Sequence, residues 1–131
     1  MRIGLAIVIT GIVGSALAAG PDWQSLGENA NGNRIYVDKA SIKAAPGGAT
    51  AVTYRTELKA PIDTPRGGIT SMRSQMRVNC RDLTAAGIEV VLFEDEAKDL
   101  AFARNKAAKI EYLREPAGSS ADIVVRYVCK K

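Results

Sequence analysis

Strict alternation of apolar and polar residues runs through the middle of the sequence and predicts two long β-strands there. In residues 50–59 one face carries Thr50, Val52, Tyr54, Thr56 and Leu58, and the other carries Ala51, Thr53, Arg55, Glu57 and Lys59. In residues 69–81 the predicted inward side chains are Thr70, Met72, Ser74, Met76, Val78 and Cys80, and the outward ones are Ser71, Arg73, Gln75, Arg77, Asn79 and Arg81. Residues 60–68 hold two prolines and two glycines, so we expect a loop there that joins the strands into a hairpin.

Shorter strand-like segments precede this hairpin. Residues 22–28 and 34–38 read as strands, and the Asn31-Gly32 pair between them suits a turn with positive φ. Asp38 can cap a single helical turn over residues 39–43, which Pro46 and the two glycines after it would end.

The segments after the hairpin are less uniform. Residues 87–94 are apolar on both faces, which predicts a strand that lies centrally or is covered on both sides. A solvated turn follows at residues 95–99, and residues 100–104 and 107–115 are further strand candidates. The Ala, Lys and Leu content of residues 97–110 fits a helix equally well, so that element stays open between helix and strand.

The end of the chain predicts a helix packed by one apolar stripe. Ser119 can cap it and Asp122 falls in its first turn, with Lys130 and Lys131 near its carboxyl end. The stripe consists of Ile123, Val124, Tyr127 and Val128. A strand remains the alternative, because the segment is rich in β-branched residues and would place Ile123, Val125, Tyr127 and Cys129 on one face. The preferred reading is an α+β protein: an antiparallel β-sheet meander followed by a C-terminal α-helix.

The N-terminal segment predicts export. Arg2 is followed by an uninterrupted run of apolar and small residues, and Ala16 and Ala18 match the small positions that a signal peptidase reads. We therefore expect a signal peptide over residues 1–18 and a single domain over residues 19–131. A retained membrane anchor is the alternative, but the run falls short of the roughly 20 apolar residues that span a bilayer. No cysteine near the cleavage site could accept a lipid.

Charge and cysteine content narrow the class of protein. Removal of residues 1–18 would leave 17 basic and 14 acidic residues, a net charge of +3, which permits anionic partners without requiring them. Nothing indicates a nucleic-acid binder. In an oxidising compartment an isolated pair, Cys80 and Cys129, is expected to form one disulfide, and the alternatives are free thiols or an intermolecular bridge.

Catalytic constellations are scarce in this sequence. The chain has no histidine, so the usual arrangements of Ser, His and Asp or of Cys and His cannot be built. The acidic residues at 94–99 could offer oxygen ligands to calcium, but the run lacks the glycine and the alternating spacing of a calcium loop, and we read it as a solvated turn. We expect no enzyme activity, cofactor or metal.

Arginines on the outward face of the hairpin are the candidate binding residues. Arg73, Arg77 and Arg81 recur every four residues, about 13 Å apart along a strand, and Arg55 on the neighbouring strand extends the patch. Such spacing suits successive anionic groups of a glycosaminoglycan, the phosphates of lipopolysaccharide or an acidic protein segment. The alternative is that the arginines only keep the strand soluble and block unwanted pairing.

Short motifs distributed over the chain resemble the surface-adhesin protein E family of exported proteobacterial proteins. They are "YVDKASI" at residues 36–42, "VNC" at 78–80, "EPAGSS" at 115–120 and "VRYVCKK" at 125–131, after an early Trp23. The resemblance implies an antiparallel sheet with a C-terminal helix tethered by the disulfide. Two departures stand out: this chain lacks the lipid-accepting cysteine of the best-known members, and Tyr112 stands where many members carry tryptophan.

The functional expectation follows from the resemblance together with the arginines. It is a non-enzymatic exported binding module, in the periplasm, secreted or at the cell surface, which docks an extracellular-matrix or envelope macromolecule. Matrix partners such as vitronectin or laminin are known for some members of the family. The alternatives are a structural, self-associating periplasmic protein, a homodimer included, and a small periplasmic inhibitor.

Overall fold

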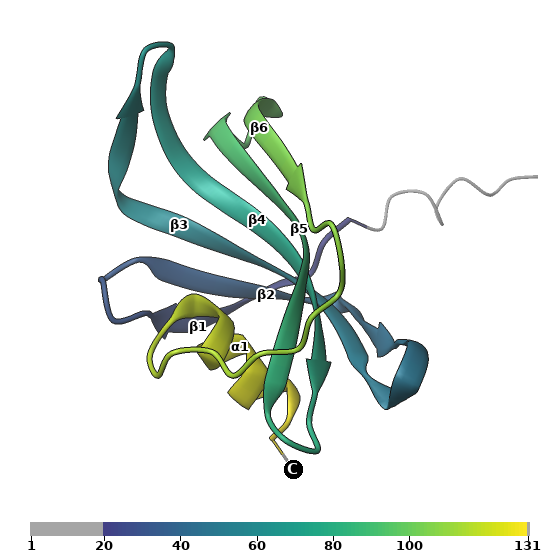
Figure 1. Cartoon of the computed structure of the whole chain (residues 1–131). Coiled ribbons are helices and arrows are strands. Elements are labelled where there is room, and N and C mark those ends of the chain that lie inside the picture. The colour runs from purple at the N-terminus through teal and green to yellow at the C-terminus, as the bar shows by residue number, and fades with distance from the viewer. Residues whose placement is uncertain (1–19, 131) are drawn as a thin grey trace, which may run out of the picture.

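The alternating segments of the sequence form one antiparallel sheet in the computed structural model, which describes residues 20–130 (Figure 1). The strands are β1 (Trp23–Glu28), β2 (Arg34–Ala44), β3 (Thr50–Thr64), β4 (Gly67–Asn79), β5 (Thr84–Asp95) and β6 (Leu100–Lys106). Each strand pairs with the next one along the chain, in the order β1-β2-β3-β4-β5-β6. This arrangement is the predicted meander, and the helix α1 (Ser120–Val128) follows it, which confirms the predicted α+β fold.

The helix forms because its amino end is capped and its apolar stripe has a partner. The Ser119 hydroxyl accepts a hydrogen bond from the Asp122 backbone N–H at 3.1 Å, and Asp122 pairs with Arg126 one turn later. Val124 and Val125 are buried against the sheet, while Ile123, Tyr127 and Val128 are partly buried beside them. The helix reading of the tail is therefore confirmed over the strand alternative.

The core lies between α1 and one face of the sheet. Its buried members come from four strands and the helix: Ile35, Val37, Val52, Met76, Val78, Ala85, Val124 and Val125. Within residues 20–130, no helix covers the opposite face of the sheet. We call that opposite face, which carries Tyr36, Arg55, Arg73, Gln75 and Arg77, the open face.

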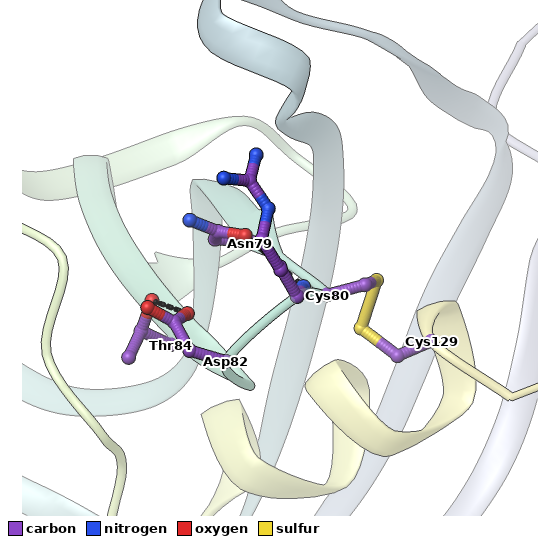
Figure 2. The surroundings of a disulfide bond; sticks show 6 residues. Asn79, Cys80, Asp82, Thr84 and Cys129 are labelled. Atoms are coloured by element: carbon purple, nitrogen blue, oxygen red, sulfur yellow. Dashed lines mark hydrogen bonds between the residues drawn. A yellow bond between two sulfur atoms is a disulfide. The ribbon is translucent and has the colours of Figure 1, made fainter.

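A disulfide and a set of hydrogen bonds fix α1 at both of its ends. Cys80, just beyond β4, is bonded to Cys129 at the C-cap of α1, as the sequence predicted (Figure 2). At the other end, the Ser120 hydroxyl oxygen accepts hydrogen bonds from the Asn29 side-chain amide, in the turn after β1, at 3.0 Å and from the Thr56 hydroxyl on β3 at 3.1 Å.

Two predicted interruptions of the sheet are wrong. Residues 39–43 form no helical turn, because β2 continues to Ala44 through a bulge, where Asp38 caps the Ala40 N–H and Ser41 accepts from Thr53 on β3. Residues 60–68 form no nine-residue loop: β3 and β4 continue past a bulge and turn at residues 65–66. Pro61 is tolerated because it lies in the bulge, where the ladder needs no N–H from it.

The C-terminal half resolves the element that the sequence left open. Residues 100–106 are a strand, β6, and residues 96–99 are the expected turn before it. The strand candidate at 107–115 is wrong: the segment makes only an isolated bridge between Leu113 and Ala85. β5 is paired on both sides but is not central, since it is the fifth of six strands and lies beside the outer strand β6. Its Val91 and Phe93 are nevertheless buried.

The predicted signal peptide over residues 1–18 and the predicted role of Lys131 lie outside the described residues. Of the helices in residues 20–130, none has the length and apolar content needed to cross a membrane.

Candidate functional site

Two of the predicted arginines lie side by side at the centre of the open face. Arg55 on β3 and Arg73 on β4 are register partners, and Tyr36 on β2 pairs with Arg55 on its other side. Directly opposite like charges on neighbouring strands destabilise a sheet unless something compensates them. A countercharge is therefore expected between the two guanidinium groups.

Glu96 provides that countercharge from the turn between β5 and β6. One of its carboxylate oxygens accepts from Arg55 Nε at 2.9 Å and from the Ser71 hydroxyl at 2.8 Å. The other accepts from Arg73 Nε at 3.1 Å and Arg73 Nη2 at 2.6 Å. The side chain of Glu96 is only 13% exposed, so these bonds form in a partly desolvated environment, where charge-assisted hydrogen bonds are strong.

The pKa of Glu96 reports the balance of burial and hydrogen bonding. Burial by itself would raise the pKa of this carboxyl, because it disfavours the charged form. The hydrogen bonds from Ser71, Arg73 and Arg55 outweigh burial, and the pKa lies below its ordinary value of 4.5. Glu96 is therefore a charged structural partner of both arginines at neutral pH.

Aromatic rings complete the surroundings of the two arginines. The Arg55 guanidinium lies 5.0 Å from the ring centre of Tyr36 and 5.8 Å from that of Trp23. The Arg73 guanidinium lies 5.6 Å from the centre of Trp23 and 5.4 Å from that of Phe93. Contacts at these distances are within the range of cation–π attraction and restrict the rotamers of both arginines.

The charges of this cluster nearly cancel. Glu57 lies 3.5 Å from Arg34 and 3.8 Å from Arg55, and Glu96 binds Arg55 and Arg73. Three arginines thus face two glutamates, and the group as a whole carries a net charge of only +1.

Arg77 and Arg81, the other two predicted arginines, are in a different situation. Arg77 lies on the open face with Ala51 as its register partner, and Lys43 pairs with Ala51 from the other side. Arg81 is exposed beyond the end of β4, and its guanidinium comes near Gly48 in the Pro46–Gly48 turn. Neither arginine forms an ion pair with another side chain in residues 20–130.

The structure corrects the solvated outer face that the sequence predicted. Ser71 was expected to point outward into solvent, but it is 2% exposed because Glu96 lies over it. Glu96 itself was expected in a solvated turn. The aromatic partners Trp23, Tyr36 and Phe93 were not predicted as site residues either. No local sequence signal joins these residues, since Glu96 is 23 residues from Arg73 and 41 from Arg55.

Within residues 20–130, no group of three or more His, Cys, Asp or Glu side chains is placed to hold a metal ion. The fold and the open face together define a small α+β protein whose helix is tethered to the sheet by a disulfide and whose other sheet face is open to solvent.

The sequence matches the profile of the surface-adhesin protein E family over residues 23–130, and the chain belongs to that family.

Solved structures of Haemophilus influenzae protein E have a similar fold. Crystal form II superposes with a TM-score of 0.56 at 16% identity, covering 86% of this chain and 93% of that one. Protein E from non-typeable Haemophilus influenzae gives 0.54 at 15% identity, covering 82% and 74%. At such identities the likeness concerns the fold. No curated protein matches the sequence at a significant level.

Proposed function

We propose that this protein is a non-enzymatic exported binding module that docks a macromolecular, anionic partner at the cell envelope through its open face. The observation that carries the proposal is the free charge of Arg77 on a face that no helix covers in residues 20–130, together with that of the exposed Arg81 just beyond the end of β4. Arg55 and Arg73 add a net positive, rigidly held centre beside them.

Family membership supports the adhesive part of the proposal. The surface-adhesin protein E family is named for adhesion, which requires export. For this chain we propose removal of residues 1–18 after Ala18 and residence in the periplasm or at the cell surface. The mass of the intact protein purified from the periplasm tests the cleavage site.

The most ordered polar cluster on the open face is unsuited to acid–base catalysis. Both oxygens of Glu96 already accept hydrogen bonds, and its lowered pKa keeps it ionised at neutral pH. The chain also lacks histidine. These features favour binding over catalysis.

Retention on immobilised anionic and matrix ligands tests the proposal. The protein, expressed from the full sequence and purified oxidised from the periplasm, is compared with an Arg77→Gln, Arg81→Gln variant on heparin and on vitronectin across a salt gradient. This pair leaves the Glu96 cluster intact. The control variant is Lys109→Gln, Lys130→Gln, which removes the same charge from two exposed positions outside the strands of the sheet.

We expect the arginine variant to elute at clearly lower salt than both the native protein and the control, with an unchanged melting temperature. If the native protein is not retained on either ligand, the proposal is wrong. If the two variants elute together, net charge and not the open face determines retention.

Self-association is the alternative, and the two outer strands favour it. β1 and β6 each pair on one side only within residues 20–130, so either edge could add a strand from a second copy. The mass in solution, measured by light scattering over a range of concentrations, distinguishes a monomeric binding module from a dimer.

A further inference from the structure

A groove of about 290 Å³ opens on the open face at the end away from Glu96. Its walls include Ser41, Lys43, Ala51, Thr53, Gln75 and Arg77. The groove exists because Ala51 stands between Lys43 and Arg77 in the register, so a methyl group separates two long cationic side chains. Across two strand spacings their Cα atoms lie about 10 Å apart, close enough for both side chains to reach one anionic group.

The positive charge of this groove is uncompensated. Neither Lys43 nor Arg77 has an ion-pair partner in the described part of the chain. The acidic residues nearest in the register have other partners: Asp38 accepts from two backbone N–H groups, and Glu89 lies 3.6 Å from Arg104. An anion entering the groove therefore meets two free donors and no free carboxylate in contact with them.

Polar side chains between the two cations add neutral hydrogen-bonding capacity. The Gln75 amide is exposed, and neither it nor the Thr53 hydroxyl has a hydrogen-bond partner among residues 20–130. Amide and hydroxyl groups side by side are suited to bind the hydroxyls of a sugar ring.

Two other kinds of partner fit this place less well. β3 and β4 are paired on both sides here, so a peptide cannot add as a strand and would lack the backbone bonds that usually bind extended peptides. A lipid would need a broad apolar surface, whereas the larger apolar side chains that line the groove are Val52 and Met76, which are buried, and the half-buried Ile88.

We propose that this groove binds a sulfated sugar unit of an acidic polysaccharide, with Lys43 and Arg77 on the sulfate and Gln75 and Thr53 on the ring hydroxyls. The guanidinium fork and the ammonium group match a compact anion with several oxygens. Arg81 is exposed in the turn directly after β4, with its guanidinium near Gly48, and adds a further cation beyond the end of the strand that carries Arg77. This inference rests on the proposed function and names its ligand class and contact residues.

Calorimetric titration with a heparin-derived octasaccharide tests the inference on the oxidised, processed protein. We compare the native protein with Lys43→Gln, Arg77→Gln, and with the charge-matched Lys109→Gln, Lys130→Gln control, whose two positions lie outside the strands. A Gln75→Ala, Thr53→Val variant, which retains every charge, tests the sugar contacts. We expect roughly tenfold or greater loss of affinity for the first variant, little change for the control, and a smaller loss for the uncharged variant.

The possible results distinguish a failure of the groove proposal from a failure of the proposed function. If the native protein binds the octasaccharide but the groove variant and the control lose affinity equally, the groove is not the site, and only the proposal of anion binding is supported. If the protein binds vitronectin but not the octasaccharide, the polysaccharide class is wrong. If the Lys43→Gln, Arg77→Gln variant loses affinity but the Gln75→Ala, Thr53→Val variant does not, the groove binds the anionic group alone and the proposed sugar contacts are wrong. If nothing binds, both proposals fail.

Discussion

Glu96 is the residue on which the arrangement of the open face depends. Arg55 and Arg73 are register partners, and both contact the Glu96 carboxylate, which is 13% exposed. The Glu96 carboxylate turns a repulsive pair into a fixed cluster, and the rings of Trp23 and Phe93 restrict it further. A face held in this way can present the neighbouring free arginines without changing shape.

Replacing Glu96 should destabilise the fold in a pH-dependent manner. Its folded pKa lies below 4.5, so the charged carboxylate stabilises the fold above about pH 4.5, and that contribution is lost as the pH falls through the folded pKa. We predict that Glu96→Gln lowers the free energy of unfolding by about 2 kcal/mol at pH 7, and that the difference shrinks below pH 4.5. Urea unfolding from pH 7 to pH 3 measures this, with the exposed Glu111→Gln as control.

Glu115 should affect stability in the opposite direction from Glu96. Burial first, and then the charge of Asp122, raise the pKa of Glu115 above 4.5, so its ionised form destabilises the fold at neutral pH. The penalty is relieved as the pH falls through the raised pKa. Glu115→Gln should therefore be more stable than the native protein at pH 7 and lose that advantage near pH 4. If Glu96→Gln and Glu115→Gln changed the free energy of unfolding at pH 7 by the same amount and in the same direction, the stabilising role assigned to Glu96 would be contradicted.

At this scale the sequence predicted which face Arg55, Arg73 and Arg77 occupy but not what they contact, and it extended the strand through Arg81, which lies in the turn after β4. Alternation alone places Arg55, Arg73 and Arg77 on one side of the hairpin. The contact with Glu96 depends on how a turn more than 20 residues away folds over Ser71. Such a contact leaves no periodic or compositional trace in the sequence, so Glu96 was read as solvated.

Among the elements, α1 depends most on its covalent tether. The disulfide closes a loop of 49 residues and joins the end of α1 to the end of β4 (Figure 2). In the chain-entropy model such a loop stabilises the fold by roughly 4 kcal/mol. We predict that the Cys80→Ala, Cys129→Ala variant has a correspondingly lower midpoint concentration of guanidinium chloride in an unfolding titration.

The matching control is the native protein with its disulfide reduced, which should unfold at a midpoint close to that of the double variant. A variant as stable as the oxidised protein would mean that packing of Val124 and Val125 alone fixes α1. The hydrogen bonds of Ser120 to Asn29 and Thr56 hold the other end of α1 in either case.

The elements show where local signals suffice and where they fail. The hairpin, the capped helix and the disulfide follow from alternation, the Ser119 cap and the isolated cysteine pair. The turn at residues 39–43 and the loop at 60–68 were wrong because Asp, Pro and Gly mark bulges as readily as chain reversals. The pairing of the neighbouring strand decided between these options, and a single sequence does not show it.

The whole molecule has two unlike faces. One is covered by α1 and contains the core (Figure 1). The other carries the aromatic and arginine cluster and the groove between Lys43 and Arg77, and Arg81 is exposed just beyond the end of β4. We propose that binding uses the face opposite the core, at the arginines that the Glu96 cluster does not involve. Charge changes at the free arginines should therefore alter binding while leaving the melting temperature unchanged.

The most direct test of the central claim is an NMR titration with heparin that follows the Nε–Hε signals of the arginine side chains. Arg77 and Arg81 belong to the proposed surface, whereas Arg126 is an exposed arginine on α1, on the other side of the sheet. We predict that the Arg77 and Arg81 signals shift on titration and that the Arg126 signal does not. Shifts confined to Arg126, or equal shifts of all three, would contradict the assignment of the open face as the binding surface.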